Sequence, residues 1–188
     1  MAPILGIYAS SASPNVYANS FESIATTTVG AGGSSSITFS SIPSTYQHLQ
    51  IRVIGHTTRT TGGVGGEVYA NFNSDTGANY GQHTLKGDGS TVTASGYASQ
   101  TTPLIGRVGT DAYGAAYFGA LVIDVLDYAS TNKYKTVRTL AGYDGNGSGE
   151  IWFTSTLWTN TNAITSMTIS SNYNFTQYSS FALYGIKG

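Results

Sequence analysis

Residues 133–158 read KYKTVRTLAGYDGNGSGEIWFTSTLW, and this stretch decides the fold class. Two runs of alternating apolar and polar residues flank the segment DGNGSG at 144–149, which is rich in residues that tolerate positive φ. Because side chains point alternately to the two faces of a β-strand, a period of two predicts strands rather than helices. The stretch therefore predicts an antiparallel hairpin with its turn at residues 144–149.

Similar short alternating runs occur along the rest of the chain, and glycine, proline or Asx residues separate them. We expect about nine to eleven strands, with a turn about every 8–15 residues, and no helix. This spacing predicts an all-β protein, an antiparallel jelly-roll-like β-sandwich that forms a single domain over residues 20–188. The expected strands lie at residues 21–29, 36–42, 47–58, 68–73, 79–86, 114–128, 133–143, 150–158, 164–170 and 181–187, with one further strand and a loop in 91–107.

The composition excludes several classes of function. Charged residues make up only 9% of the 188 residues, against about 25% in an average globular protein. A net charge of −1 provides no basic surface for nucleic acid, so we expect no nucleic-acid partner. The chain has no cysteine, which excludes disulfides, thiolate metal sites and a cysteine nucleophile. No run approaches about 20 consecutive apolar residues, so we expect no membrane insertion.

The first 19 residues differ in character from the rest. Residues 1–8, MAPILGIY, are apolar, and residues 9–19 are rich in Ser, Ala, Pro and Asn, which predicts an extended N-terminal arm with a flexible tether. One interpretation is a first strand or a frayed end, and the other is an attachment arm that docks into a partner. The short apolar run does not resemble a signal peptide. The docking residues of such an arm would be Met1, Pro3, Ile4, Leu5, Ile7 and Tyr8.

Residues 114–128 form an expected strand that is apolar on both faces. Tyr117, Leu121, Ile123 and Val125 lie on one face, and Phe118, Ala120, Val122 and Leu126 lie on the other. Each sheet of a sandwich meets the core with only one face, so the other face of this strand needs a second cover. Three covers fit this requirement: the N-terminal arm, a long loop, or another subunit.

The strand at residues 150–158 also has two hydrophobic faces. Trp152 and Trp158 alternate onto one face together with two threonines, and Ile151, Phe153 and Leu157 take the other. If the Ile/Phe/Leu face fills the core, the tryptophans lie on the outer face. Exposed tryptophans stack on sugar rings and are enriched in protein interfaces. A subunit interface, a glycan platform and a second core within the chain all remain open.

Two carboxylate patterns suggest chemistry, but neither is complete. Asp124 and Asp127 are three residues apart, so on one strand they face opposite ways, whereas glycoside hydrolysis needs two carboxyls that converge on one bond. The segment at 144–149 matches the first half of a calcium loop, but Ser155 stands where an EF-hand has its twelfth-position carboxylate. Turn formation and local pairing explain these acids more simply.

The histidines also lack a site pattern, because they lie on three separate segments without zinc-ligand spacing. We therefore expect no catalytic residue, no bound metal and no cofactor, and we expect that the chain is not an enzyme. The three histidines are His48, His56 and His83.

Three stretches together carry a family resemblance: FSSIPSTYQHLQIR at 39–52, FNSDTGANYGQHTL at 72–85 and FALYGIKG at 181–188. The chain resembles a group of virion proteins of tailed bacteriophages, described as tail-fibre-like or minor structural proteins. The short apolar head, MAPILGI, and the Leu-Tyr-Gly-Ile end are common to such sequences. The resemblance covers most of the chain, and it brings no catalytic motif that maps onto positions here.

The resemblance implies a non-enzymatic protein on the surface of the virion, made in the bacterial cytoplasm. It implies a homotrimeric tail or fibre protein for host adsorption, attached to other virion proteins by its N-terminal arm and able to contact host surface glycan. A capsid decoration or cement protein is the main alternative. A carbohydrate-binding module and a glycan-degrading enzyme acting through Asp124 or Glu150 are further alternatives. The expected contacts to sugars or sister chains are Trp152, Trp158, Tyr117 and the loop-tip residues Tyr97 and Tyr113.

Overall fold

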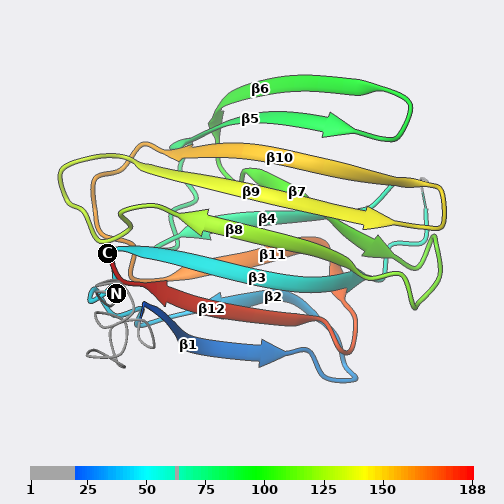
Figure 1. Cartoon of the computed structure of the whole chain (residues 1–188), viewed down its shortest axis with the longest axis horizontal. Helices are drawn as coiled ribbons and strands as arrows, with labels where there is room; N and C mark the ends of the chain where they lie inside the picture. Colours follow the sequence, from blue (N-terminus) through cyan, green and yellow to red (C-terminus); the bar gives the residue numbers. More distant parts are fainter. Residues whose placement is uncertain (1–19, 62–63) are drawn as a thin grey trace, which may run out of the picture.

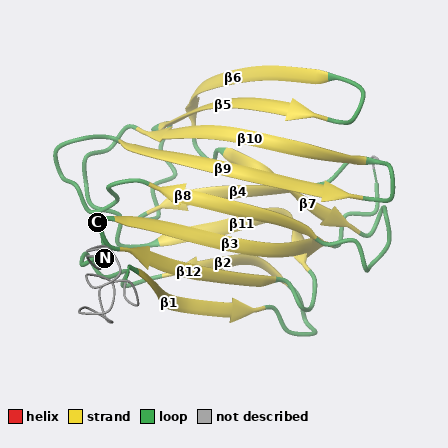
Figure 2. Cartoon of the chain, in the orientation of Figure 1, coloured by secondary structure: helices red, strands yellow, loops and turns green. Residues whose placement is uncertain are grey.

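A computed structural model describes residues 20–61 and 64–188, and these residues form twelve β-strands and no helix (Figures 1 and 2). The expected all-β class is thus confirmed for this part of the chain, whereas the predicted arm at 1–19 lies outside the described residues. In chain order the strands are β1 (Phe21–Thr28), β2 (Ser34–Phe39), β3 (His48–Thr57), β4 (Gly66–Phe72), β5 (Tyr80–Gly87), β6 (Val92–Gln100), β7 (Leu104–Thr110), β8 (Gly119–Val125), β9 (Lys135–Asp144), β10 (Gly149–Trp158), β11 (Met167–Phe175) and β12 (Ser180–Ile186).

The strands form two sheets that are joined at one strand. The large sheet has the order β1-β12-β3-β8-β9-β10-β5-β6, and every pair in it is antiparallel. The small sheet has the order β2-β11-β4-β7 and is also antiparallel. The end of β3 leaves the large sheet and pairs with β7 in parallel, His56 with Gly109 and Thr57 with Thr110. This crossing closes the two sheets on each other at one end.

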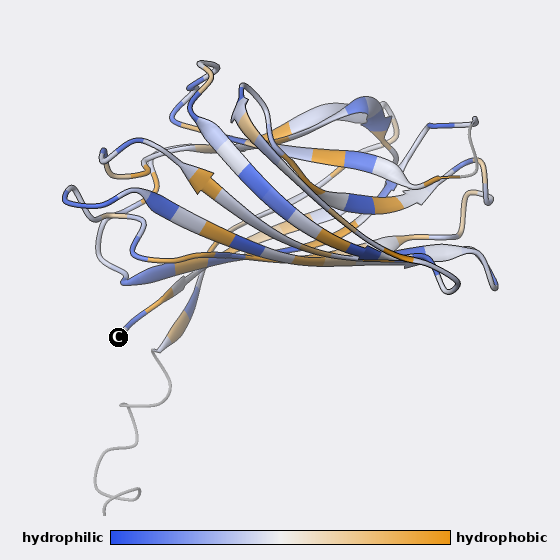
Figure 3. Ribbon diagram, turned by 90° about the horizontal axis from the view of Figure 1, so that it is seen from above, coloured by the Kyte–Doolittle hydropathy of each residue, from blue (hydrophilic) through white to orange (hydrophobic). Residues whose placement is uncertain are grey.

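The core lies between the inward sides of the two sheets, and it follows from the alternation in the sequence (Figure 3). Along β4, for example, every second residue from Gly66 to Phe72 is buried. The sheets approach closely where a glycine faces the opposite layer. A Cβ on Gly106 of β7 would lie 2.5 Å from the Cβ of Ala141 on β9, so no larger residue fits there. The large sheet contributes Leu49, Ile51, Val53, Leu121, Ile123 and Val125 to this core.

Three expectations about strands were wrong. Residues 91–107 contain two strand segments, β6 and the start of β7, instead of one strand and a loop. The reason is that β6 is exposed along almost its whole length, so no buried face imposes alternation on its sequence. Strand β8 begins only at Gly119, so Tyr117 lies in the preceding connection and not beside Leu121. Tyr97 lies inside β6 and not at a loop tip.

The orientation of β10, which the sequence left open, is the one that places the tryptophans in the core and not on the outer face. Trp152 and Trp158 face inward, with only 7% and 0% of their surface exposed, while Ile151 and Phe153 on the other face are 66% and 48% exposed. Each indole N–H, which must find an acceptor when it is buried, has a carboxylate partner. Trp152 Nε1 donates to Glu150 at 2.9 Å, and Trp158 Nε1 donates to Asp75 at 2.7 Å.

Trp158 is packed at the centre of an aromatic group in the core. Its ring centroid lies 5.6 Å from that of Phe72 on β4 and 6.4 Å from that of Tyr80 on β5. The Tyr80 hydroxyl donates to the carbonyl of Asp75 at 3.0 Å, so the carboxylate and the backbone of Asp75 fasten both rings. The small sheet and the large sheet therefore meet at this indole.

We predict that Trp158→Ala lowers the free energy of unfolding by about 3–5 kcal/mol, because it leaves a large cavity between the sheets. Phe153→Ala on the same strand should cost less than about 1 kcal/mol, because Phe153 lies on the solvent side. Urea unfolding of the two variants beside the wild type measures both values. Equal losses, or a larger loss for Phe153→Ala, would contradict the inward orientation of the tryptophans.

Candidate functional site

An unbroken row of apolar side chains crosses the outward side of the large sheet. The strand register places Val122 of β8 beside Leu140 of β9, Leu140 beside Phe153 of β10, and Phe153 beside Leu85 of β5. Leu140, Phe153 and Leu85 are 57%, 48% and 50% exposed. Four neighbouring strands thus present hydrophobic side chains to solvent at one level of the sheet.

A second apolar row runs beside the first, one step of the pleat along the strands. In this row Ile54 of β3 pairs with Ala120, Ala120 with Gly142, and Gly142 with Ile151. Ile54 and Ile151 are 52% and 66% exposed. We call the two rows together the apolar face. Its members are Ile54, Leu85, Ala120, Val122, Leu140, Ile151 and Phe153.

The apolar face is shallow and contains hollows rather than a deep cleft, and two of them lie beside its protruding side chains. One hollow, of about 370 Å³, lies where Gly142 leaves a gap between Ala120, Leu140 and Ile151. The other, of about 430 Å³, lies beside Phe153 above the small residues Ala94 and Gly96 of β6. Each hollow therefore adjoins a protruding apolar side chain.

A polar row bounds the apolar face on one side. It runs from Gln50 through Asp124 and Arg138 to Ser155 and His83. The Gln50 amide donates to Asp124 Oδ1 at 2.9 Å and thereby fixes this carboxylate on the sheet. Asp124 and Arg138 are register partners, so this boundary carries both signs of charge side by side.

Arg52 ends the first apolar row on the β3 side. Its guanidinium lies over the rings of Phe21 and Tyr184, 5.1 Å and 5.5 Å from the two centroids, and its Nε donates to Gln50 Oε1 at 2.9 Å. These contacts hold the cation over the aromatic pair of β1 and β12. The hydrophobic part of the outward surface is therefore centred on β8, β9, β10 and β5.

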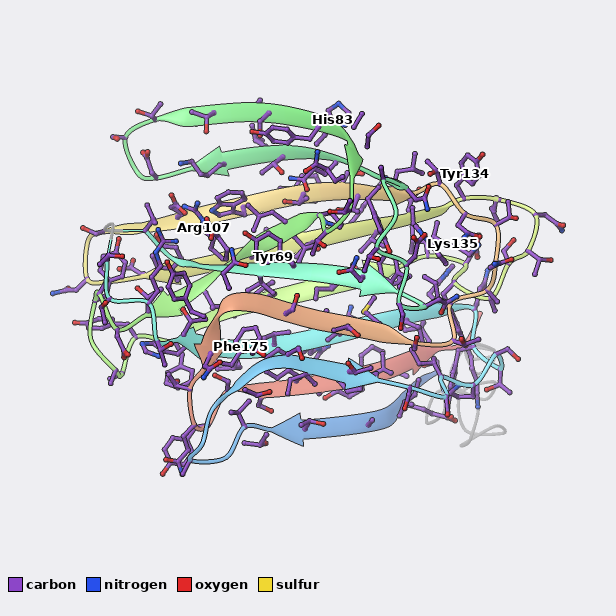
Figure 4. All side chains as sticks on the ribbon, turned by 180° about the vertical axis from the view of Figure 1, so that it is seen from behind. Tyr69, His83, Arg107, Tyr134, Lys135 and Phe175 are labelled. Carbon is purple, nitrogen blue, oxygen red and sulfur yellow. The ribbon has the colours of Figure 1, made fainter. Side chains whose placement is uncertain are left out.

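Beneath the apolar face, a cluster of charges fastens β10 to the small sheet. The carboxylate of Glu150, 7% exposed, accepts hydrogen bonds from Arg107 at 3.1 Å, Trp152 at 2.9 Å and Lys86 at 3.2 Å. The guanidinium of Arg107 lies 4.9 Å from the centroid of the Trp152 ring. It also donates to Glu67 at 3.3 Å on the neighbouring strand β4, where Figure 4 shows Arg107 close to Tyr69.

The electrostatics of this cluster keep Glu150 ionised. Burial alone would raise the pKa of Glu150, but the hydrogen bond from Trp152 and the charges of Arg107 and Lys86 outweigh it and hold the pKa below its ordinary value. Three donors occupy the carboxylate, so it serves as a structural acceptor between the sheets. This arrangement explains why a glutamate and a tryptophan two residues apart both face inward.

A second buried group with an uncommon environment is Lys135, at the start of β9 (Figure 4). Its ammonium donates to the backbone carbonyls of Lys133 at 2.9 Å and Thr161 at 3.1 Å. Burial, and next the charge of Lys133, lower the pKa of Lys135. The lysine acts as a clamp that ties the loop after β10 to the loop before β9.

The structure brings together one constellation that the sequence did not reveal. Nδ1 of His56 lies 3.1 Å from Oγ1 of Thr176, and Nε2 lies 3.7 Å from a carboxylate oxygen of Asp111. These are the residue types of a nucleophile–histidine–acid triad. However, the imidazole is fully buried, and 3.7 Å is longer than a hydrogen bond. Thr176 is 120 residues from His56, so no local pattern could have indicated this contact.

The aspartates that the sequence analysis considered lie in separate parts of the structure, and each has its own local partners. Asp127 forms an ion pair with Lys133 at 2.5 Å, its backbone N–H donates to Nδ1 of His48 at 3.0 Å, and the hydrogen bond from Lys133 lowers the pKa of Asp127. Asp144 accepts the backbone N–H of Gly147 at 3.1 Å inside the hairpin turn. Within residues 20–61 and 64–188, no group of three or more His, Cys, Asp or Glu side chains could hold a metal ion.

The residues expected to contact sugars or sister chains do not form one surface. Trp152 and Trp158 are buried within the chain, so neither is available on the surface of this structure. Tyr97 is 54% exposed on β6, and Tyr117 is 36% exposed in the connection between β7 and β8. Tyr113, in the same connection, packs on Tyr143 with a centroid distance of 5.6 Å. The expected docking residues Met1, Pro3, Ile4, Leu5, Ile7 and Tyr8 lie outside the described residues.

We predict that Glu150→Gln lowers the free energy of unfolding at pH 7 by about 1.5–3 kcal/mol, because it replaces buried charge-assisted hydrogen bonds by neutral ones and leaves Arg107 with Glu67 alone. The pKa of Glu150 is lower in the folded chain than the ordinary value of 4.5, so its contribution is fully present above that value and is lost as the pH falls through the folded pKa. The loss of stability on acidification should therefore be smaller in the variant.

Urea unfolding of wild type and Glu150→Gln at pH 7 and at pH 3 checks both parts of this prediction. Asp144→Asn is the control, because it removes an exposed carboxylate from the same hairpin. A variant as stable as the wild type at pH 7 would show that the cluster does not hold the sheets together.

The chain matches no protein-family model, no curated protein and no solved structure. In the part of the chain that the structure describes, no helix is long and apolar enough to cross a membrane.

Proposed function

We propose that the chain is a structural protein of a tailed bacteriophage virion, displayed on the particle surface, and that it acts by adhesion and not by catalysis. The observation that carries this proposal is the apolar face, which the described residues leave uncovered. Monomeric soluble proteins rarely expose a large contiguous apolar patch, and such patches mark interaction sites. The resemblance to phage virion proteins agrees with a molecule that works inside an assembly.

The strand order supports a jelly-roll architecture within this proposal. Without the hairpins β5–β6 and β9–β10, eight strands remain, in the orders β1-β12-β3-β8 and β2-β11-β4-β7 (Figure 1). Renumbered from one to eight, these orders are 1-8-3-6 and 2-7-4-5, which is the jelly-roll arrangement of two interleaved Greek keys. The two hairpins then extend one of the two sheets. Jelly rolls are frequent among viral capsid and lectin domains.

The proposed molecule is a homotrimer of the tail or fibre type that takes part in host adsorption. Residues 1–19 serve as its attachment arm to other virion proteins. The arm joins the domain at β1, an edge strand whose one partner in the large sheet is β12. An arm that leaves from an edge strand can extend away from the domain without disturbing the sheet.

Decoration of the capsid is the second candidate for the same particle. The twelve strands form one body of two sheets, and the described residues contain no coiled-coil or β-helical shaft. A compact domain with an apolar arm suits a cement protein that bridges neighbouring capsid subunits. The two candidates differ in where on the particle the chain lies.

We predict that removal of residues 1–19 leaves a folded domain that no longer joins particles. The measurement is mass spectrometry of purified particles from cells that express the full chain or the truncated chain, with circular dichroism of each protein as the folding control. Gold-labelled antibody on intact particles separates a tail location from a capsid location. Full incorporation of the truncated chain would overturn the role of the arm, and absence of the full chain from particles would overturn the proposed function.

A further inference from the structure

We infer that the apolar face binds a second copy of this chain, so that the outward sides of two large sheets pack on each other. The inference rests on the proposed function in that both require the chain to associate; a two-fold contact through this face pairs two copies and is additional to the contacts within the proposed homotrimer. It adds the residues of the contact, which are centred on Leu140 and Phe153 and do not include the tryptophans.

The size of the surface fits a stable contact between subunits. The outward side of β3, β8, β9, β10, β5 and β6 is about 24 Å wide, from strand spacings of about 4.8 Å, and about 27 Å long, from eight residues at about 3.4 Å each. This gives about 650 Å², close to the roughly 800 Å² per partner of a standard protein interface. The apolar rows lie inside this area and the polar row lies at their border, which is the usual anatomy of an interface.

The shape of the apolar face is complementary to that of a second copy of the same face. The side chain of Phe153 protrudes beside the hollow above Ala94 and Gly96, and Ile151 protrudes beside the hollow at Gly142. A two-fold contact requires a surface that carries both a projection and the matching depression. Asp124 and Arg138 lie next to each other along the border, so a reversed copy brings opposite charges together.

The hairpin β5–β6 provides an independent reason for a covering molecule. Strand β6 ends the large sheet, and eight of its nine residues are exposed, including Val92 at 72%. An edge strand of this kind is open to association with another chain unless something covers it. Since β6 adjoins the hollow beside Phe153, one copy packed on the apolar face would also cover the outward side of this hairpin.

The test compares Leu140→Arg with Tyr178→Arg in the full chain. Leu140 is 57% exposed on the apolar face, and Tyr178 is 70% exposed in the turn between β11 and β12 and is not a member of that face. Sedimentation at increasing protein concentration should show an oligomer for the wild type and for Tyr178→Arg. Leu140→Arg should weaken the association constant by at least about 30-fold, as expected for a central interface residue. Circular dichroism and thermal melting confirm that each variant is folded.

Spin labelling provides a second measurement, the dipolar coupling between copies, which does not depend on the folding of Leu140→Arg. The chain has no cysteine, so Arg138→Cys and Tyr178→Cys each accept a single nitroxide. The inference requires stronger dipolar coupling between copies at position 138 than at position 178. A monomeric wild type at about 50 µM, an unchanged oligomer for folded Leu140→Arg, or equal coupling at both positions would overturn it; 50 µM lies well above the range of stable subunit contacts.

The same proteins separate this inference from the proposed function. If the wild type associates through the apolar face but is absent from phage particles, the inference stands and the proposed function fails. If the wild type joins particles but is monomeric in solution, the inference and the homotrimeric state fail, and the proposed virion role stands. Truncation at residue 19 tests the rival occupant of the face, because loss of the oligomer on truncation alone would assign the contact to the arm.

Discussion

Two hydrogen bonds from buried indoles decide which side of β10 faces the core. Trp158 donates to Asp75, and Trp152 donates to Glu150. An indole is a large hydrophobic group with one polar atom, and it can be buried at no polar cost when that atom has an acceptor. Since side chains alternate along a strand, placing both tryptophans inside forces Ile151 and Phe153 outside. The apolar face is therefore a direct consequence of how the buried polar atoms of the core find hydrogen-bond partners.

The alternation in the sequence was sufficient to locate most strands, but it could not orient β10. Both faces of this strand are hydrophobic, and the acceptor of Trp158 is 83 residues away in the chain. Pattern reading likewise failed for β6, because an exposed strand has no face that selection keeps apolar. The contact of His56 with Thr176 spans 120 residues and depends on the pairing of the end of β11 with β3, where Phe175 lies beside Thr57. Such contacts come from topology, which short-range periodicity does not contain.

The shortage of charge has a structural consequence of its own. The chain has eight basic and nine acidic residues, and one cluster around Arg107 uses five charged side chains inside or beside the core. Other charged side chains lie in loops, such as the ion pair of Asp127 and Lys133. Few charges remain for the middle of the large sheet, where most soluble proteins place Lys and Glu. The apolar rows are thus also a result of where the available charges have gone.

These two constraints together favour adhesion as the work of the molecule. The side chains best able to transfer protons, Glu150 and His56, lie inside the fold and help to hold strands together. The groups that face outward on the large sheet are aliphatic and aromatic side chains on a rigid, hydrogen-bonded surface. Such a surface loses little conformational freedom when it binds, so a larger share of its buried area becomes affinity. A sheet that is rigid, shallow and apolar is suited to hold another protein surface, and the proposed second copy of the chain offers a surface of the same shape and chemistry.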